Sequence, residues 1–136
     1  MKLLILNTKT FSYTLHHETP VAEEVKENLT HEDFKNSLAV FVAIENKDNE
    51  NTVKEAGRDI YQISILNKSN LVLLNPFAHL TSRLAKPAQA ISLLDKLAEN
   101  LCQYAEFKTE RLTFGWYKEF SLDVKGENNS QIYREY

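Results

Sequence analysis

The sequence predicts an α/β (α+β) fold in which a mixed β-sheet layer carries two main helices. Two apolar runs, residues 37–45 and 71–74, have the length and the branched side chains of strands that are covered on both faces. Each run is followed by a segment whose apolar residues recur every three or four positions, as in an amphipathic helix. Because these strands alternate with helices, and a hairpin is expected at one end of the chain, a mixed sheet is predicted.

The chain is expected to open with two strands. Residues 3–6 form a short apolar run, and residues 11–15 alternate between apolar and polar side chains. A hairpin near residues 7–9 would join them. The segment from Glu18 to Asp33 is polar and charged and has Pro20 near its start, so we interpret it as a loop or a short surface helix.

The first main helix is predicted from Asn51 to Asn67, with Asn51 or Thr52 as its cap, because the apolar stripe begins there. The strand at 71–74 should stop at the Asn-Pro pair that follows it. Proline cannot donate to a strand ladder and restricts the residue before it.

The second main helix is expected to begin at Pro87, which suits a first helical turn, and to end near Tyr104. Two further strands, about 108–114 and 117–124, follow this helix. Gly115 divides them and allows the chain to turn.

The bulk composition fits one domain over residues 1–136, with about 126–136 as a polar tail or the start of a linker. The 136 residues are 43% hydrophobic and 26% charged, as in an ordinary globular domain. The apolar runs are too short to cross a bilayer, and the N-terminus resembles a strand more than a signal peptide, so we expect a cytoplasmic protein. Cys102, the single cysteine, lies within an apolar helical pattern and is expected in the core.

Charge is distributed unevenly along the chain. A net charge of −3 disfavours a protein that grips a large nucleic acid by itself. Residues 18–59 contain 11 acidic and 5 basic side chains, whereas residues 60–136 contain 8 acidic and 9 basic ones. An anionic ligand is therefore expected near the second half, unless the acidic half is merely a solvated face.

Residues 75–87 form the first segment with candidate chemistry. They leave a buried strand and enter a helix, and ligand crevices often lie at such strand ends. His79, within this segment, can donate a hydrogen bond or relay a proton near neutral pH. Alternatively, its imidazole has only a structural role, with its hydrogen bonds made within a turn.

Residues 114–120 form the second segment, in which aromatic rings surround Lys118. Burial lowers the pKa of a lysine and an anionic substrate restores its charge, so Lys118 can orient water, stabilise an oxyanion or bind phosphate. The alternative is a lysine whose stem packs along the rings while its ammonium reaches water.

Metal and cofactor chemistry have little support. The sequence contains no HExxH or CxxC motif and no glycine-rich phosphate loop. His16 and His17 are neighbours on a predicted strand and so should point to opposite faces, while His31 is expected in solvent. We therefore predict no metal and no cofactor.

Together, the two segments resemble the N-terminal editing domain of archaeal-type threonyl-tRNA synthetases, which is similar in fold to D-aminoacyl-tRNA deacylases. The similarity spans nearly the whole chain and includes MKLLIL, VFVAIE, the PFAHL and LAKP blocks of residues 76–87, and FG-YK at residues 114–118. It implies a deacylase-like fold and hydrolysis of the ester of L-serine mischarged onto threonine tRNA. Water would be the nucleophile, assisted by the ribose hydroxyl of the substrate.

The resemblance also implies roles for particular residues. His79 and Lys118 occupy its polar catalytic positions, where Lys118 would polarise the water and the ester without becoming acylated. Gln131 stands where the family commonly has a carboxylate, and Trp116 where a smaller aromatic residue is usual. The implied substrate-binding residues are Ile44, Pro76, Phe77, Ala78, Phe114, Tyr117 and Gln131.

The implied partners are the 3′ end of threonine tRNA, the rest of a threonyl-tRNA synthetase in cis or in trans, and a second copy in a homodimer. Because such a domain grasps only the 3′ end of the tRNA, an acidic pI is compatible with this role. Two alternatives stay open. One is a free-standing deacylase that removes D-amino acids, and the other is a non-catalytic module for dimerisation or tRNA docking.

Overall fold

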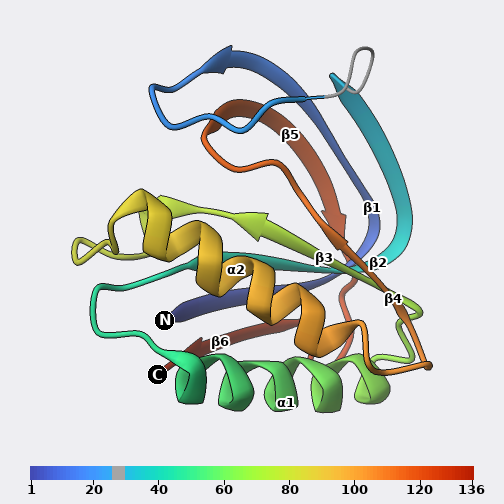
Figure 1. Cartoon of the computed structure of the whole chain (residues 1–136). Coiled ribbons are helices and arrows are strands. Elements are labelled where there is room, and N and C mark those ends of the chain that lie inside the picture. Colours follow the sequence, from blue (N-terminus) through green and yellow to red (C-terminus); the bar gives the residue numbers. More distant parts are fainter. Residues whose placement is uncertain (26–29) are drawn as a thin grey trace.

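Among residues 1–25 and 30–136, which the computed structural model describes, six strands form one curved mixed sheet (Figure 1). The strands are β1 (Lys2–Glu18), β2 (His31–Ala43), β3 (Leu71–Pro76), β4 (Lys108–Arg111), β5 (Trp116–Val124) and β6 (Gln131–Glu135). The helices are α1 (Glu50–Leu66), α2 (Pro87–Leu101) and the short 3-10 helix η1 (Ala78–Leu80). The order across the sheet is β4-β3-β2-β1-β5, and β6 also pairs with β1. The predicted mixed sheet with two main helices is confirmed.

β1 is one continuous strand of 17 residues, so the hairpin expected near residues 7–9 is wrong. β1 pairs with β2 along one edge, and along the other it pairs first with β6 and then with β5. The register against β5 shifts between Thr8 and Thr10, where an irregularity interrupts the pairing. Both backbone groups of Asn7 bond to the segment between β5 and β6, which leaves none free to close a turn.

β2 is the central strand that the 37–45 run predicted. It lies between β1 and β3, and every residue from 37 to 43 is buried. The strand begins earlier than expected, at His31, so residues 31–33 belong to the sheet and not to a loop. Residues 19–25 contain neither helix nor strand, and residues 26–29 of the predicted loop or surface helix lie outside the described residues.

The two long helices lie on the same face of the sheet (Figure 1). Asn49 caps α1 by accepting a hydrogen bond from the backbone of Asn51, and Thr52 completes the capping box, so the cap precedes the two predicted residues. α2 begins at Pro87 as predicted and ends at Leu101, before the expected Tyr104. Between the helices and the sheet lies the main core, whose fully buried members include Leu3, Leu38, Ile60, Leu74, Leu94 and Leu97.

A second apolar cluster lies apart from the main core. Its buried members are Phe11, Tyr13, Leu15, Ala39, Phe41, Leu73 and Leu112. Phe41 is central, with its ring centroid 5.1 Å from that of Phe77 and 5.6 Å from that of Phe120. Because Phe77 follows β3 and Phe120 lies in the middle of β5, this aromatic packing fixes the end of β3 relative to β5.

The C-terminal residues belong to the fold. Residues 131–135, within the segment expected to be a polar tail, form β6 on the edge of β1. The hydroxyl of Tyr136 donates to Asp59 of α1 at 2.8 Å, and the backbone N–H of Tyr136 donates to Met1 at 3.0 Å. Cys102 is exposed, so its predicted core position is wrong: α2 ends one residue before it.

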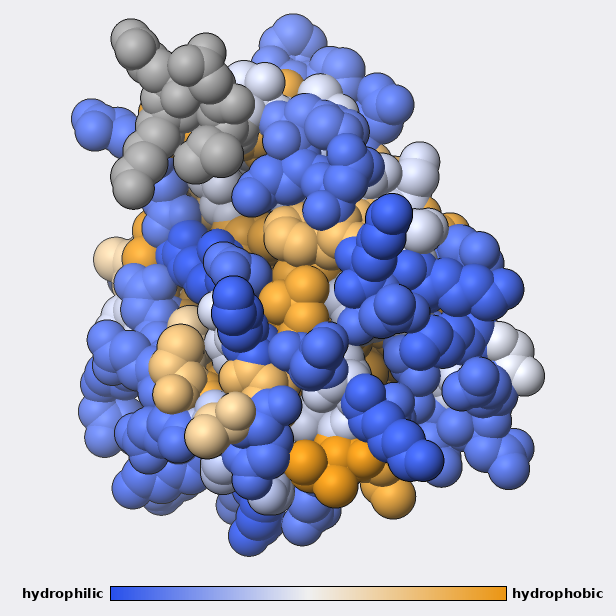
Figure 2. Space-filling model, turned by 90° about the vertical axis from the view of Figure 1, so that its right-hand side faces the viewer, coloured by the Kyte–Doolittle hydropathy of each residue, from blue (hydrophilic) through white to orange (hydrophobic). Residues whose placement is uncertain are grey.

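The surface on the side shown in Figure 2 is largely hydrophilic, with apolar atoms gathered in separate small patches. Exposed large apolar side chains include Ile65 and Leu66 at the end of α1. His31 is exposed as predicted, and its Nε2 lies 2.9 Å from Oδ2 of Asp33. No helix of the described residues is long and apolar enough to cross a membrane.

Candidate functional site

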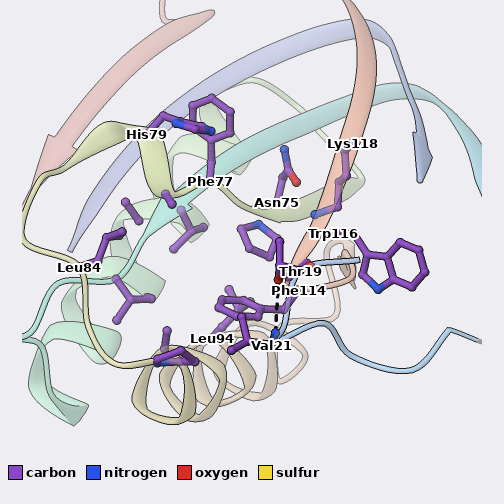
Figure 3. Close-up of a pocket in the computed structure, with 18 of the residues that line it drawn as sticks. Thr19, Val21, Asn75, Phe77, His79, Leu84, Leu94, Phe114, Trp116 and Lys118 are labelled. Atoms are coloured by element: carbon purple, nitrogen blue, oxygen red, sulfur yellow. Dashed lines mark hydrogen bonds between the residues drawn. The ribbon is translucent and has the colours of Figure 1, made fainter. Parts of the chain in front are cut away.

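A cavity of about 460 Å³ lies where β2 and β3 end, between α2 and the beginning of β5 (Figure 3). Eight of the nine predicted site residues belong to its wall: Ile44, Pro76, Phe77, Ala78, His79, Phe114, Tyr117 and Lys118. Tyr117 nevertheless keeps 65% of its surface exposed. Gln131 is not part of the wall of this chain's cavity, since it lies on β6 opposite Leu6 and is exposed.

Lys118 lies near the beginning of β5, opposite Leu15 of β1. Its side chain points into the cavity (Figure 3). Burial, the largest cause, and the positive charge of Arg111 lower the pKa of Lys118 to about 8, and the carboxylate of Glu23 partly opposes these two effects. The ammonium is therefore a cation short of compensating charge, ready to interact with an anion or a polarised carbonyl oxygen.

His79 lies on η1 at the rim of the cavity, across from Lys118 in Figure 3. Its ring packs edge-on against Phe77, with the centroids 5.0 Å apart. The side chain is exposed to solvent. His79 therefore reaches a ligand at the mouth of the cavity, whereas Lys118 reaches one inside it.

Residues 19–23, which we call the strap, hold the turn before β5. The backbone N–H and the hydroxyl of Thr19 both donate to the carbonyl of Gly115, at 2.9 and 2.7 Å. The indole N–H of Trp116 donates to the carbonyl of Glu23 at 2.8 Å. The strap thus fixes the start of the strand that carries Lys118.

The carboxylate of Glu23 ties the strap to β4. It forms two hydrogen bonds with the guanidinium of Arg111, one of them 2.6 Å long, and accepts the backbone N–H of Phe114 at 2.7 Å. Burial raises the pKa of Glu23, but these hydrogen bonds outweigh it and hold the pKa below its ordinary value. Glu23 is therefore ionised at neutral pH and lies close enough to influence the charge of Lys118.

Gly115 allows the strap and the turn to approach closely. It has a φ of 77°, and an added Cβ would lie 2.6 Å from both the Cα of Ala22 and the carbonyl oxygen of Val21. We therefore expect Gly115→Ala to displace the strap and to lower the free energy of unfolding by about 1–3 kcal/mol, from backbone strain and steric overlap.

Urea denaturation of Gly115→Ala checks this expectation, with Gly126→Ala as the matched control. A Cβ at Gly126 meets no atom within 4 Å, so the control should unfold like the parent chain. Equal stability of the two variants would show that the strap accommodates a methyl group.

The opposite wall is held by Glu45, which is fully buried. The hydroxyl of Thr81 donates to its carboxylate at 2.6 Å, and the backbone N–H of Ala85 donates to the carbonyl of Ile44 at 3.0 Å. Burial raises the pKa of Glu45, but the Thr81 hydrogen bond and the Met1 ammonium outweigh it and lower the pKa. These contacts fix residues 81–85, which bring Leu84 and Ala85 into the wall.

Several wall residues were not identified from the sequence. Thr19 and Val21 come from a segment interpreted as a polar loop, and Ala90 and Leu94 come from the inner face of α2. Their residue types are common in turns and cores and carry no local sign of a ligand. Asn75 was predicted only as the end of a strand, yet it is 2% exposed and faces the cavity.

The described wall is mainly apolar and contains no carboxylate and no cysteine. Its aliphatic hydroxyl, that of Thr19, is engaged with Gly115. No group of three or more potential metal ligands comes together in the part of the chain that the structure describes. The arrangement combines a desolvated cation with a small apolar cavity, which suits electrostatic stabilisation of a developing negative charge.

Comparisons with known proteins identify the family to which the chain belongs. The model of the archaea-specific editing domain of threonyl-tRNA synthetase matches residues 1–136. The threonine–tRNA ligase of Staphylothermus marinus is 36% identical over 136 residues, covering 97% of this chain and 22% of that protein. The ligase of Methanosarcina mazei is 32% identical over 137 residues, covering 98% of this chain and 21% of that protein. The chain therefore spans about a fifth of the length of these curated relatives.

The fold also resembles that of a solved structure, the c-Myc DNA unwinding element binding protein. The TM-score is 0.75 at 15% sequence identity, over 100% of this chain and 99% of the other. This likeness shows the fold alone, and it confirms the predicted deacylase-like fold. On the match over its whole length and the identity to the ligases, the chain belongs to the archaea-specific editing domains of threonyl-tRNA synthetase.

Proposed function

We propose that the chain hydrolyses the ester that joins L-serine to the terminal adenosine of threonine tRNA. The observation that carries this proposal is the partly buried ammonium of Lys118, which points into a cavity whose described wall holds no carboxylate. An ester carbonyl that develops into an oxyanion is stabilised by such a preorganised cation. Membership of the editing-domain family supports aminoacyl-tRNA as the class of substrate.

In the proposed reaction, water attacks the carbonyl carbon of the ester while Lys118 stabilises the oxygen that becomes negative. The bond between this carbon and the ribose oxygen then breaks. Serine leaves with the oxygen of the water, and the ribose oxygen gains a proton and becomes a hydroxyl again. The neighbouring ribose hydroxyl of the substrate assists the proton transfer, and Lys118 is not acylated.

The rigidity of the cavity wall supports discrimination against threonine. Serine and threonine differ by one methyl group, which is worth only about 1–3 kcal/mol in a binding pocket. A second site that excludes the larger side chain supplies the selectivity that one pocket lacks. Pro76, Phe77 and Ala78 form a short wall at the end of β3, and the aromatic packing of Phe77 limits how far this wall can move.

The partners follow from the same proposal. The chain would act on the 3′ end of threonine tRNA, with the rest of a threonyl-tRNA synthetase holding the tRNA in cis or in trans, and it would form a homodimer. His79 is proposed to contact the substrate at the rim of the cavity. The contact between Gln131 and the substrate stays a prediction. Light scattering of the purified chain tests the dimer directly.

Single-turnover deacylation assays test the function. The chain is mixed with threonine tRNA that carries L-serine, L-threonine or a D-amino acid, and release of each amino acid is compared with the rate in buffer alone. Rapid release of L-serine with little release of the others is expected. Faster release of D-amino acids would favour a D-aminoacyl-tRNA deacylase. Release of none would favour a non-catalytic dimerisation or docking module.

A further inference from the structure

Asn75 is a polar side chain that the proposed reaction does not yet use. It lies near the end of β3, in register with Phe41 of β2, and is only 2% exposed. Figure 3 shows its carboxamide directed into the cavity, on the side from which Lys118 enters. A polar group at this depth is expected to have a hydrogen-bond partner.

The carboxamide oxygen of Asn75 has no such partner among the described residues. A buried acceptor without a hydrogen bond destabilises a folded protein, so an unpaired one inside a cavity is placed to accept a hydrogen bond from a bound ligand. Other buried polar atoms are unpaired as well, but of all the residues concerned only Asn75 belongs to the described wall of the cavity. The unpaired oxygen therefore coincides with the place where the substrate would bind.

The partner of the Asn75 oxygen must be a hydrogen-bond donor, because an amide oxygen can only accept. The described wall contains no carboxylate, and Lys118 is itself a donor. The hydroxyl of Thr19 already donates to Gly115. An aminoacyl ester of serine brings an α-ammonium and a hydroxyl into this cavity, and either group needs an acceptor once it leaves water.

We propose that Asn75 is a substrate-binding residue, whose carboxamide oxygen accepts a hydrogen bond from the aminoacyl group. The inference rests on the proposed function and names the atom that receives an N–H or O–H donor of the substrate. If the donor is the hydroxyl, Asn75 contributes to selection of serine. If the donor is the α-ammonium, Asn75 holds any L-aminoacyl group of suitable size.

The test replaces Asn75 by leucine, which has the same branching and no polar atom. Asn100→Leu is the matched control, because Asn100 also carries a buried carboxamide oxygen without a partner but lies outside the cavity wall. We expect Asn75→Leu to slow release of serine about 10- to 100-fold, the loss typical of a hydrogen bond to a charged or well-placed group. Asn100→Leu should release serine at the rate of the parent chain.

Two substrates distinguish the donors. Threonine tRNA charged with alanine keeps the ammonium and lacks the hydroxyl. Equal losses with seryl and alanyl esters assign the α-ammonium, and a loss confined to the seryl ester assigns the hydroxyl. Rates of Asn75→Leu within twofold of the parent chain for both esters would overturn the inference while leaving the proposed function intact.

Folding and binding measurements separate the remaining outcomes. Because leucine removes an unpaired buried oxygen, the melting temperature of Asn75→Leu should equal or exceed that of the parent chain. Titration with a non-hydrolysable analogue, 3′-seryl-amino-adenosine, tests binding without hydrolysis. Weaker binding by Asn75→Leu, together with unchanged binding by the control Asn100→Leu, supports the inference even if the parent chain hydrolyses nothing. Absence of binding by the parent chain, or equal binding by parent and variant, rejects it.

Discussion

Lys118→Met is expected to reduce hydrolysis of seryl-tRNA about 100- to 1000-fold, the usual loss when one preorganised group that stabilises an oxyanion is removed. Methionine keeps much of the length and apolar stem of lysine and removes only the cation. Single-turnover release of labelled serine measures the effect. The matched control is Lys9→Met, since Lys9 is 61% exposed on β1 and outside the cavity wall.

Stability should not fall with activity in this variant. Burial lowers the pKa of Lys118 to about 8, which shows that the folded state disfavours its charge. Between pH 8 and the ordinary lysine value of 10.5, the unfolded chain binds more protons than the folded chain, so this group makes the free energy of unfolding rise with pH. Lys118→Met should lack this rise and be at least as stable as the parent chain at pH 7. Full hydrolytic activity of the variant would remove Lys118 from the mechanism.

The same pKa predicts the pH dependence of hydrolysis. If the charged ammonium polarises the ester, enzymatic release of serine should decrease as the pH rises through about 8, after subtraction of spontaneous hydrolysis. A rate that instead increases through this range would assign a general-base role to the neutral amine of Lys118.

Glu23→Gln is expected to lower the free energy of unfolding by about 1–3 kcal/mol, because it removes one of the two carboxylates that pair with the guanidinium of Arg111 and leaves only Asp95, at 3.0 Å. The side chains of Glu23 and Arg111 are largely buried, at 26% and 17% exposure. Since the strap would loosen at the start of β5, hydrolysis should fall about 10-fold as Lys118 loses its fixed position. Urea denaturation and single-turnover release measure the two effects.

The neighbouring change Glu24→Gln is the control for Glu23→Gln. It removes the same charge from an exposed side chain and should leave both stability and hydrolysis unchanged. The pH profile adds a further check. Because Glu23 raises the pKa of Lys118, its loss should move the alkaline decrease in activity to lower pH. Identical behaviour of the two variants would show that the Glu23–Arg111 pair does not position Lys118.

The parts of the fold that the sequence predicts well are those with strong local signals. The branched apolar run at 37–45 is a buried central strand, and Pro87 begins a helix. The continuity of β1 and the strand in residues 131–135 were missed, because both depend on pairing between the two ends of the chain. Cys102 was misplaced because an apolar pattern does not fix the last residue of a helix.

The candidate site likewise contains residues that the sequence predicts and residues that it does not. The segments around His79 and Lys118 were singled out from their residue types, but a structural explanation was favoured for each of these two residues taken singly. Their functional roles were predicted through the family resemblance. The strap and the unpaired oxygen of Asn75 have no local signature. The strap acts through contacts between segments that are far apart in the sequence, such as Glu23 with Arg111. The oxygen of Asn75 is recognised only because the fold places it, unpaired, in the wall of the cavity.

The continuity of β1 also has a kinetic consequence. Its first residues pair with the last strand, as in Lys2 with Glu135, and its later residues pair with β5. Contacts of such long sequence separation slow folding, because a large loop must close before they form. During synthesis, the outer edge of β1 can pair only after β5 and β6 have left the ribosome. Lys118 therefore enters its cavity only after the four preceding strands and both long helices have been made.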